Sequence, residues 1–143
     1  MQNLYTRLIA YDPSELYSKF KIDRCLRRQQ IAMCEFFPNA VAGICACGCG
    51  VALTGKRTRW ATSDCHKFPF LVWAVIVCRP DIIRGVITFR DGDGCVRCGD
   101  THGLQVDHIL PVRMGGGGCW LDNYQLLCVT CHKAKTRLEA KNG

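Results

Sequence analysis

Two Cys-x-x-Cys pairs, Cys95/Cys98 and Cys128/Cys131, constrain this chain more than any other feature of its sequence. In a reduced protein, paired cysteines at this spacing bind a metal more often than they form disulfides. Four thiolates complete the tetrahedral coordination of Zn²⁺, so the pairs predict a structural zinc ion rather than a catalytic one. The 29 residues between Cys98 and Cys128 exceed the gap of a common zinc ribbon. The insert between the pairs is therefore expected to form structure of its own.

The insert has the pattern of a strand, a loop and a second strand, and a helix follows the last cysteine pair. Residues 104–109 alternate as a strand that ends before Pro111, and residues 121–127 form a turn and a second strand. Between them lies a glycine-rich loop, residues 113–118, which lets the backbone approach a phosphate closely. Residues 131–141 predict a helix. Its inner face is expected to carry Ala134 and Leu138, and its outer face Lys133, Lys135 and Arg137.

Four side chains in and after the insert suit the cleavage of a phosphodiester bond: Asp107, His108, Asn123 and His132. This reaction needs a base to activate the nucleophile and a cation to stabilise charge on the phosphate. His108 suits the base, because imidazole exchanges protons near neutral pH. Asp107 and His132 suit one divalent ion, and Asn123 suits orienting His108 through its tautomer or its backbone.

Each of these residues also has an ordinary explanation. An Asp-His pair is usually a surface pair, an isolated Asn is usually a turn residue, and His132 could neighbour the zinc or replace Cys131 as a ligand. The joint occurrence of all four residues around the cysteine pairs favours the catalytic interpretation. Strict alternation would place Asp107 and His108 on opposite faces of their strand, so a shared site requires the strand to fray near Pro111.

A second group of cysteines, Cys45, Cys47, Cys49 and Cys65, predicts another four-ligand metal site, because Gly and Ala spacers let the chain fold around an ion. His66 could replace one of the three clustered cysteines. The turn-rich segment that follows carries Lys56, Arg57 and Arg59 beside Trp60, which suits contact with a DNA backbone. The alternative is a knuckle that only stabilises the loop.

The remaining segments show no chemistry of their own. Residues 1–40 are expected to be helical, with a capped helix start at 12–15 and a second helix over 22–36. The arginines of that helix suit either a DNA backbone or a solvated face. Residues 70–78 are either a buried strand or a buried helix, and residues 82–89 predict a short helix. That helix should bury Ile83, Val86 and Ile87, and the isolated Cys25, Cys34, Cys78 and Cys119 should be small buried apolar side chains.

Charge and hydrophobicity set weaker limits. The formal net charge is +7, but zinc-bound thiolates would offset much of it, so the global charge supports nucleic-acid binding only modestly. No apolar segment has the length of about 18 residues that a membrane span needs. The first residues also lack the pattern of a signal peptide. We therefore expect no membrane partner and a location in the reducing cytoplasm, or in the host cytoplasm for a phage-encoded chain.

The sequence resembles the HNH endonuclease family, in the Cys-clamped form found in phage and restriction-type nucleases. The segments that carry the resemblance are CVRCG (95–99), LQVDHILPV (104–112), GGGGCWLDNYQLLC (115–128) and CHKAKT (131–136). The resemblance as a whole runs from about residue 84 to residue 141, about two-fifths of the chain. The resemblance implies a ββα-metal (His-Me finger) fold. It also implies His108 as general base, Asp107 and His132 as ligands of the catalytic metal, Asn123 as the central residue of the motif and Lys135 as a phosphate contact.

The upstream half is similar to a small zinc element that precedes the HNH motif in some phage-type proteins. That element usually carries a Cys pair followed by an aromatic-Cys-Ser-x-x-Cys segment. Here Ala61 stands where a Cys is expected, after Trp60 and before Cys65. We expect the extra cysteine of the upstream cluster to supply the missing ligand.

Taken together, the sequence predicts an α+β protein in which a zinc-stabilised nuclease domain (residues 81–143) follows a helical region (1–40) and a Cys-rich knuckle with an apolar connector (41–80). The expected function is metal-dependent hydrolysis of DNA, by nicking or double-strand cleavage, with Mg²⁺, Mn²⁺, Ni²⁺ or Zn²⁺ as the catalytic ion. The alternatives are a non-catalytic zinc-ribbon adaptor for DNA binding or packaging, and an RNA-directed nuclease. Oligomeric state and protein partners, such as packaging machinery, are left open. The expected DNA contacts are Lys135, Lys133, Arg113, Arg57 and Arg59.

Overall fold

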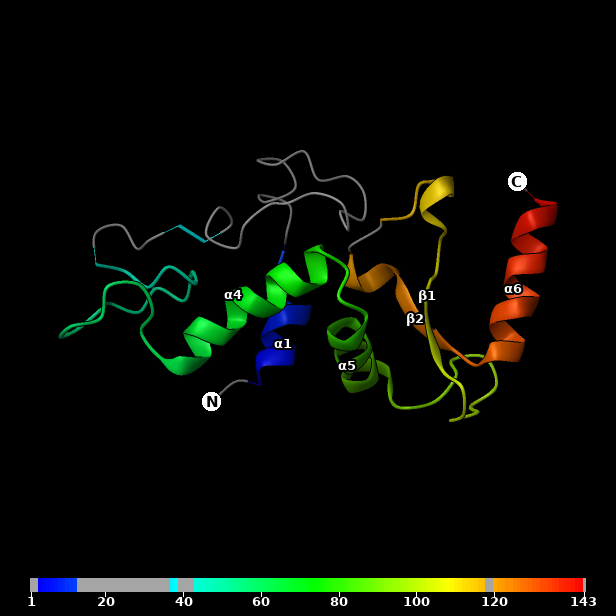
Figure 1. The fold of residues 1–143 in the computed structure, drawn as a ribbon, viewed down its shortest axis with the longest axis horizontal. Coiled ribbons are helices and arrows are strands. Elements are labelled where there is room, and N and C mark those ends of the chain that lie inside the picture. Colours follow the sequence, from blue (N-terminus) through cyan, green and yellow to red (C-terminus); the bar gives the residue numbers. More distant parts are fainter. Residues whose placement is uncertain (1–2, 13–36, 39–42, 118–119, 143) are drawn as a thin grey trace.

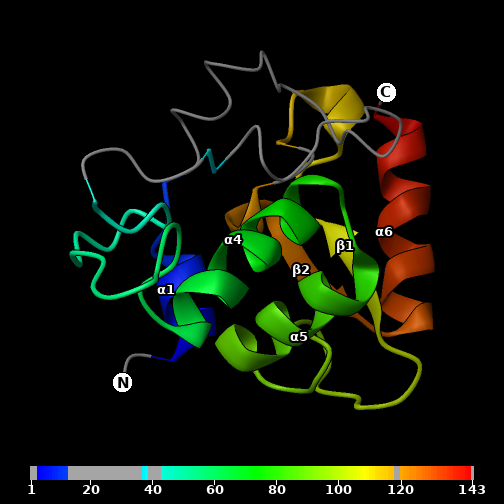
Figure 2. The ribbon, with the colours of Figure 1, turned by 60° about the vertical axis from the view of Figure 1, so that its left-hand side comes forward.

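Helices α1 (Leu4–Ile9), α4 (Ser63–Ile76) and α5 (Pro80–Asp91) pack against one another and form one side of the molecule (Figures 1 and 2). The computed structural model describes residues 3–12, 37–38, 43–117 and 120–142. Thr62 caps α4 by accepting a hydrogen bond from the Cys65 N–H, and Pro80 opens α5, where its missing N–H costs nothing. Sequence signals at the helix starts thus fix where α4 and α5 begin.

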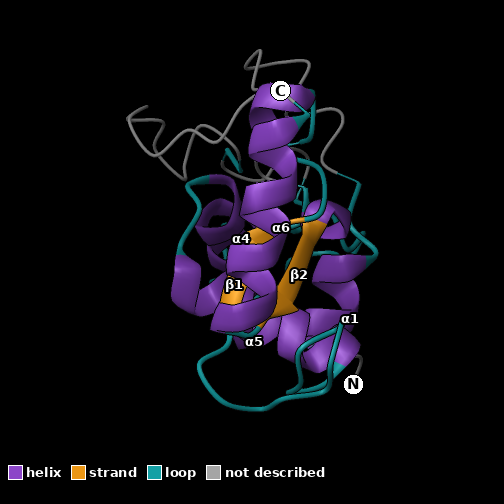
Figure 3. Ribbon diagram, turned by 90° about the vertical axis from the view of Figure 1, so that its right-hand side faces the viewer, coloured by secondary structure: helices purple, strands orange, loops and turns teal. Residues whose placement is uncertain are grey.

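A two-stranded antiparallel hairpin lies between α5 and α6 (Val129–Lys141), and α6 crosses both strands (Figure 3). The strands are β1 (Gln105–His108) and β2 (Tyr124–Leu127). Two short 3₁₀ turns, η1 (Val112–Met114) and η2 (Leu121–Asn123), lie in the connection between the strands. The order strand, loop, strand, helix is the one that the sequence predicts, and the α+β fold class is confirmed.

Alternation along β2 sends successive side chains to different surroundings. Leu126 joins a large apolar cluster that also contains Leu8, Phe68 and Ile87, so the helices and the hairpin share one core. The next residue, Leu127, is equally buried but packs in a smaller cluster with two cysteines, Cys95 and Cys128. The hairpin therefore has an α5 face and an α6 face, and this division decides where the polar side chains of the insert lie.

Most of the apolar run at 70–78 belongs to a helix, which ends at Ile76, so the choice between a strand and a helix is settled for this segment. Helix α4 begins at Ser63 and continues through Pro69, which is buried within it. Residues 82–89 lie within α5, whose buried residues are the predicted Ile83, Val86 and Ile87. The strands and the last helix lie where predicted, although β2 is shorter because residues 121–123 form η2, and α6 begins two residues earlier.

The predicted orientation of α6 is right for Lys133 and Arg137, which are exposed, but wrong for Ala134, Leu138 and Lys135. Ala134 is exposed, and Leu138 is 55% exposed. Lys135, expected on the outer face, is only 7% exposed. The reason is electrostatic, because Lys135 lies against the carboxylates of Asp107 and Glu139, which compensate its buried charge.

Cys78 departs from its predicted role. It is buried, but its sulfur is disulfide-bonded rather than simply packed among apolar side chains. Cys25, Cys34 and Cys119 lie outside the described residues, as do the predicted helix at 22–36 and most of the helix start at 12–15. Within the described part of the chain, no helix is long and apolar enough to cross a membrane.

Candidate active site and cysteine clusters

The two Cys-x-x-Cys pairs meet at the base of the hairpin. The sulfur atoms of Cys95, Cys98, Cys128 and Cys131 all lie within 4.8 Å of one another. Gly99 turns the chain after the first pair with a φ of 78°, and its N–H donates to the Cys95 carbonyl. The second pair opens α6, where the Cys128 sulfur accepts a hydrogen bond from the Cys131 N–H.

The clustered thiols differ in acidity because each affects the charge of its neighbours. Burial would raise the pKa of Cys95, but hydrogen bonds from backbone N–H groups at Cys128, Arg97 and Cys98 lower it to about 6. Contacts with the sulfur atoms of Cys128 and Cys98 raise the pKa of Cys131 to about 12. Four thiolates at this separation repel one another, and a tetrahedral divalent cation is the group that allows all four to ionise.

Asp107 and His132 come together on the α6 face of the hairpin. Asp107 projects from β1, His132 from the first turn of α6, and the distance from Asp107 Oδ1 to His132 Nε2 is 3.4 Å. Lys135 Nζ lies 3.0 Å from Asp107 Oδ2 and also pairs with Glu139. Burial would lower the pKa of Lys135, but its bonds to Glu139 and Asp107 raise it, so the ammonium stays charged.

Gln125 and Glu139 also contact this group of side chains, although no local sequence pattern by itself marks either residue. Gln125 is paired with Asp107 across the hairpin, and its Nε2 donates to Asp107 Oδ2 over 2.9 Å. Glu139 follows Lys135 by one helical turn. The signal for Gln125 is the strand register, and the signal for Glu139 is the i,i+4 spacing, which gains meaning only once Lys135 is known to face inward.

His108 lies on the opposite face, as strand alternation requires. Its ring lies 4.6 Å from the ring of Tyr124, its partner across the hairpin. The two residues line a pocket of about 300 Å³ that also includes Arg84 of α5. The fraying that the sequence led us to expect does not occur at His108, because this residue stays paired with Tyr124 and the next N–H, that of Ile109, donates to the Asn123 carbonyl. Asp107 and His108 are thus adjacent in sequence, but their side chains lie on opposite faces of β1.

Asn123 holds the segment that leaves His108. Its Nδ2 donates to the carbonyls of Leu110 and Gly117, and its Oδ1 accepts from the Leu110 N–H, at 2.9–3.0 Å. The Asn123 carbonyl also accepts from the Ile109 N–H at 2.8 Å. These contacts act on the backbone that follows His108.

The chain is similar to known proteins over the segment that contains the hairpin and the four-cysteine clamp. A sequence model described as HNH endonuclease matches residues 95–138. Over 68 residues, 43% of this chain and 71% of the relative, the chain is 38% identical to a protein of Lactococcus phage SK1 named "Probable HNH endonuclease". The chain belongs to the HNH endonuclease family. The match to the family model covers the hairpin, the cysteine clamp and most of α6.

This HNH protein is also similar to one segment of much larger relatives. Over 43 residues, which are 30% of this chain, it is 58% identical to the mouse and human proteins named "DNA annealing helicase and endonuclease ZRANB3". The chain spans only about 4% of the length of those relatives. No solved structure matches it.

The residues of this HNH site fit a divalent ion. Carboxylate and imidazole ligands bind such ions at about 2.0–2.2 Å, which places two ligand atoms of a tetrahedral ion about 3.4 Å apart. Asp107 Oδ1 and His132 Nε2 have this separation, and Asp107 is only 13% exposed. Two protein ligands leave positions open for water and phosphate, as a catalytic rather than a structural site requires.

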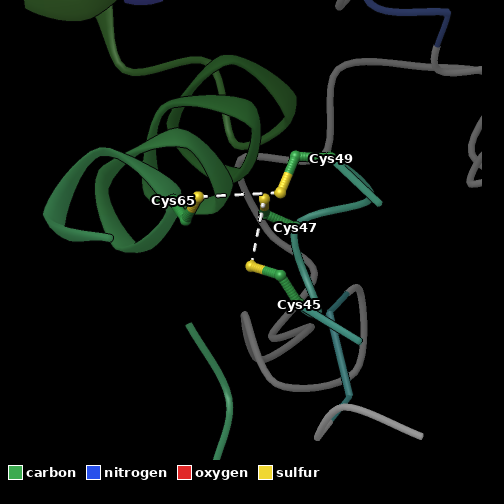
Figure 4. Close-up of side chains that lie close together, drawn as sticks. All are labelled: Cys45, Cys47, Cys49 and Cys65. Atoms are coloured by element: carbon green, nitrogen blue, oxygen red, sulfur yellow. Dashed lines mark hydrogen bonds between the residues drawn. The ribbon is translucent and has the colours of Figure 1, made fainter. Parts of the chain in front are cut away.

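The upstream cysteines form a second cluster, in which Cys65 of α4 faces three cysteines of the preceding loop (Figure 4). The Cys45 sulfur accepts a hydrogen bond from the N–H of Ala61, so it lies beside the position where the family element would carry a cysteine. His66 is not part of the cluster, and its ring lies 6.0 Å from that of Trp60. The four members are Cys45, Cys47, Cys49 and Cys65, with sulfur atoms within 4.8 Å of one another.

Three hydrogen bonds connect the sulfur cluster of Cys45, Cys47, Cys49 and Cys65 to α1 and to the start of α4. Arg7 of α1 donates from Nη2 to the Cys47 carbonyl at 2.9 Å and to its sulfur at 3.3 Å, and Thr62 Oγ1 donates to the Cys65 sulfur at 3.2 Å. Burial raises the pKa of Cys47 to about 12 despite the Arg7 bond, whereas bonds from Thr62 and neighbouring thiols outweigh burial and lower that of Cys65 to about 7.

The predicted DNA-contact residues occupy different environments. Lys133 and Arg57 are exposed, and Arg113 is exposed but donates to the Glu139 carbonyl at 3.0 Å. Arg59 lies over the Trp60 ring at 4.7 Å and donates to the Phe37 carbonyl, so its guanidinium supports the loop. Lys135 is buried in the HNH site.

Proposed function

We propose that the protein is a metal-dependent endonuclease that hydrolyses DNA phosphodiester bonds. The observation that carries the proposal is the approach of Asp107 Oδ1 to His132 Nε2 at 3.4 Å, with His108 at the adjacent end of the strand. One carboxylate and one imidazole suit Mg²⁺, Mn²⁺, Ni²⁺ or Zn²⁺. DNA is favoured as the substrate because the ZRANB3 relatives carry it in their names.

The residues divide the reaction between them. His108 accepts a proton from a water molecule whose oxygen forms a bond to phosphorus, and the bond from phosphorus to the leaving sugar oxygen breaks. That oxygen takes a proton from solvent. Asp107 and His132 would hold the divalent ion, which supplies positive charge to the phosphate and leaving oxygen. Asn123 fixes the backbone after His108, and the exposed Lys133 supplies a cation for the DNA backbone.

Both cysteine clusters are proposed to hold structural Zn²⁺. Each brings four thiols within 4.8 Å, and each draws its ligands from two segments of the chain. The clamp of Cys95, Cys98, Cys128 and Cys131 would join the entry to β1 with the start of α6. The upstream cluster would join its loop to α4. A closed set of four thiolates leaves no position for substrate, so neither ion would take part in the reaction.

The test is the conversion of supercoiled plasmid to open-circle and linear forms, with and without Mg²⁺ or Mn²⁺. His108→Ala should abolish cleavage but keep DNA binding and zinc content. The matched control is His102→Ala, because His102 lies on an exposed turn with a side chain 93% accessible to solvent.

Cleavage that persists in His108→Ala would contradict the assignment of the base. If a folded, zinc-loaded protein fails to cut DNA with every divalent ion tested, that result would instead support the adaptor function. A parallel assay on RNA of the same sequence distinguishes the two substrates.

A further inference from the structure

The two oxygens of the Asp107 carboxylate have different partners. Oδ2 accepts a hydrogen bond from Gln125 Nε2 at 2.9 Å and lies 3.0 Å from Lys135 Nζ. Oδ1 faces His132 Nε2 at 3.4 Å. One oxygen is thus occupied by two donors, whereas the other faces the second ligand of the proposed divalent ion.

Strand register and helix periodicity place these donors. Gln125 is the cross-strand partner of Asp107, so its amide reaches the carboxylate without leaving the α6 face. Lys135 follows His132 by one turn of α6 and therefore points to the same side of the helix. Glu139, one further turn along, pairs with Lys135 and keeps its ammonium inside the site.

Lys135 would lose two charged partners if it turned out toward a phosphate. Its side chain is almost fully buried between Asp107 and Glu139, and separating a buried ammonium from its carboxylates is costly. Its position suits a contact that persists throughout the reaction, and Asp107 is the residue that receives it.

We propose that Gln125 and Lys135 are positioning residues, which together hold Asp107 Oδ2 so that Oδ1 alone is presented to the divalent ion beside His132. Glu139 keeps Lys135 in place. This inference rests on the proposed function, because it assigns Asp107 to metal binding. Such outer contacts fix ligand orientation, and their loss typically weakens metal affinity by about 10–100-fold.

The experiment measures Mn²⁺ affinity by titration calorimetry and by the loss of the free-ion electron paramagnetic resonance signal. It uses the His108→Ala protein, in which no substrate is consumed. Gln125→Met keeps the length of the side chain but removes the donor, and it should weaken Mn²⁺ binding about tenfold or more. Gln105→Met is the matched control, since Gln105 is an exposed glutamine of the facing strand, and it should change the affinity less than twofold.

Zinc content and the midpoint of thermal unfolding show whether an effect is merely structural, and both should stay unchanged in Gln125→Met. When Gln125→Met is made in the protein that retains His108, saturating Mn²⁺ should restore the cleavage of DNA by this variant. Glu139→Gln should also weaken Mn²⁺ binding, because the Lys135 ammonium then relies on Asp107 alone.

If Gln125→Met binds Mn²⁺ as tightly as its parent, the positioning role is wrong. If the parent itself binds no Mn²⁺, the proposed function fails first, and the positioning role fails with it.

Discussion

Replacing Gly116 with alanine is expected to disrupt the backbone around His108 without touching any ligand. A Cβ at this position would lie 1.9 Å from the Leu110 carbonyl oxygen and 2.8 Å from Asn123 Nδ2. Both distances are below the 3.0 Å that Cβ atoms essentially never cross, and the much shorter one is with backbone, so the loop has to move. The displaced atoms are those through which Asn123 binds the segment after His108.

The size of the effect follows from the bonds at risk. Asn123 makes three side-chain hydrogen bonds, to both backbone groups of Leu110 and to the Gly117 carbonyl. At about 1 kcal/mol each, their loss lowers the free energy of unfolding by about 2–3 kcal/mol. For a chain of this size, that corresponds to a fall in the thermal midpoint of about 6–9 °C.

The assay is urea unfolding monitored by circular dichroism, together with plasmid cleavage, for Gly116→Ala, Asn123→Ala and the double variant. Both single variants should lose cleavage. The double variant should be little less stable than either single one, because both remove the same contacts. A Gly116→Ala protein with native stability and cleavage would refute the reasoning, as would fully additive losses in the double variant.

Three further predictions concern zinc and charge. Cys98→Ser should remove zinc from the clamp and unfold the hairpin and α6, as measured by zinc content and limited proteolysis; a normal fold without zinc would show that the clamp assignment is wrong. Cys45→Ser should reduce the zinc content from two ions per chain to one while the clamp ion stays, whereas an unchanged content of two would exclude Cys45 as a ligand. In the His108→Ala background and without added divalent ion, Lys133→Ala should weaken DNA binding and lower the salt slope by about 0.9, whereas Lys135→Met should leave both unchanged because Lys135 is buried.

Spacing and alternation predicted those parts of the site that depend on nearby residues. The Cys-x-x-Cys pairs predicted a four-sulfur cluster, which the structure contains. Strict alternation places Asp107 and His108 on different faces, and the structure keeps this alternation, so the expectation that the strand frays and brings both residues into one site is wrong. These rules succeed because they act over a few residues of regular backbone.

Residues whose role depends on a distant partner were missed or misplaced. Lys135 was expected outside because a lone lysine on a helix is best solvated, and only the Asp107 and Glu139 carboxylates make its burial favourable. Gln125 is an ordinary strand residue until the register pairs it with Asp107. The loop glycines were assigned to phosphate contact, but Gly116 is required by the close approach of the Leu110 carbonyl.

The pairing of β1 with β2 has a consequence for how errors in folding would affect activity. A slip of one residue along the ladder would send Asp107 toward α5 and His108 toward α6, because side chains alternate along a strand. The metal ligand and the base would then be misplaced in a single event, and no partly active intermediate arrangement would exist. Cleavage by this protein would therefore measure directly the fraction of molecules in which the hairpin has paired in its native register.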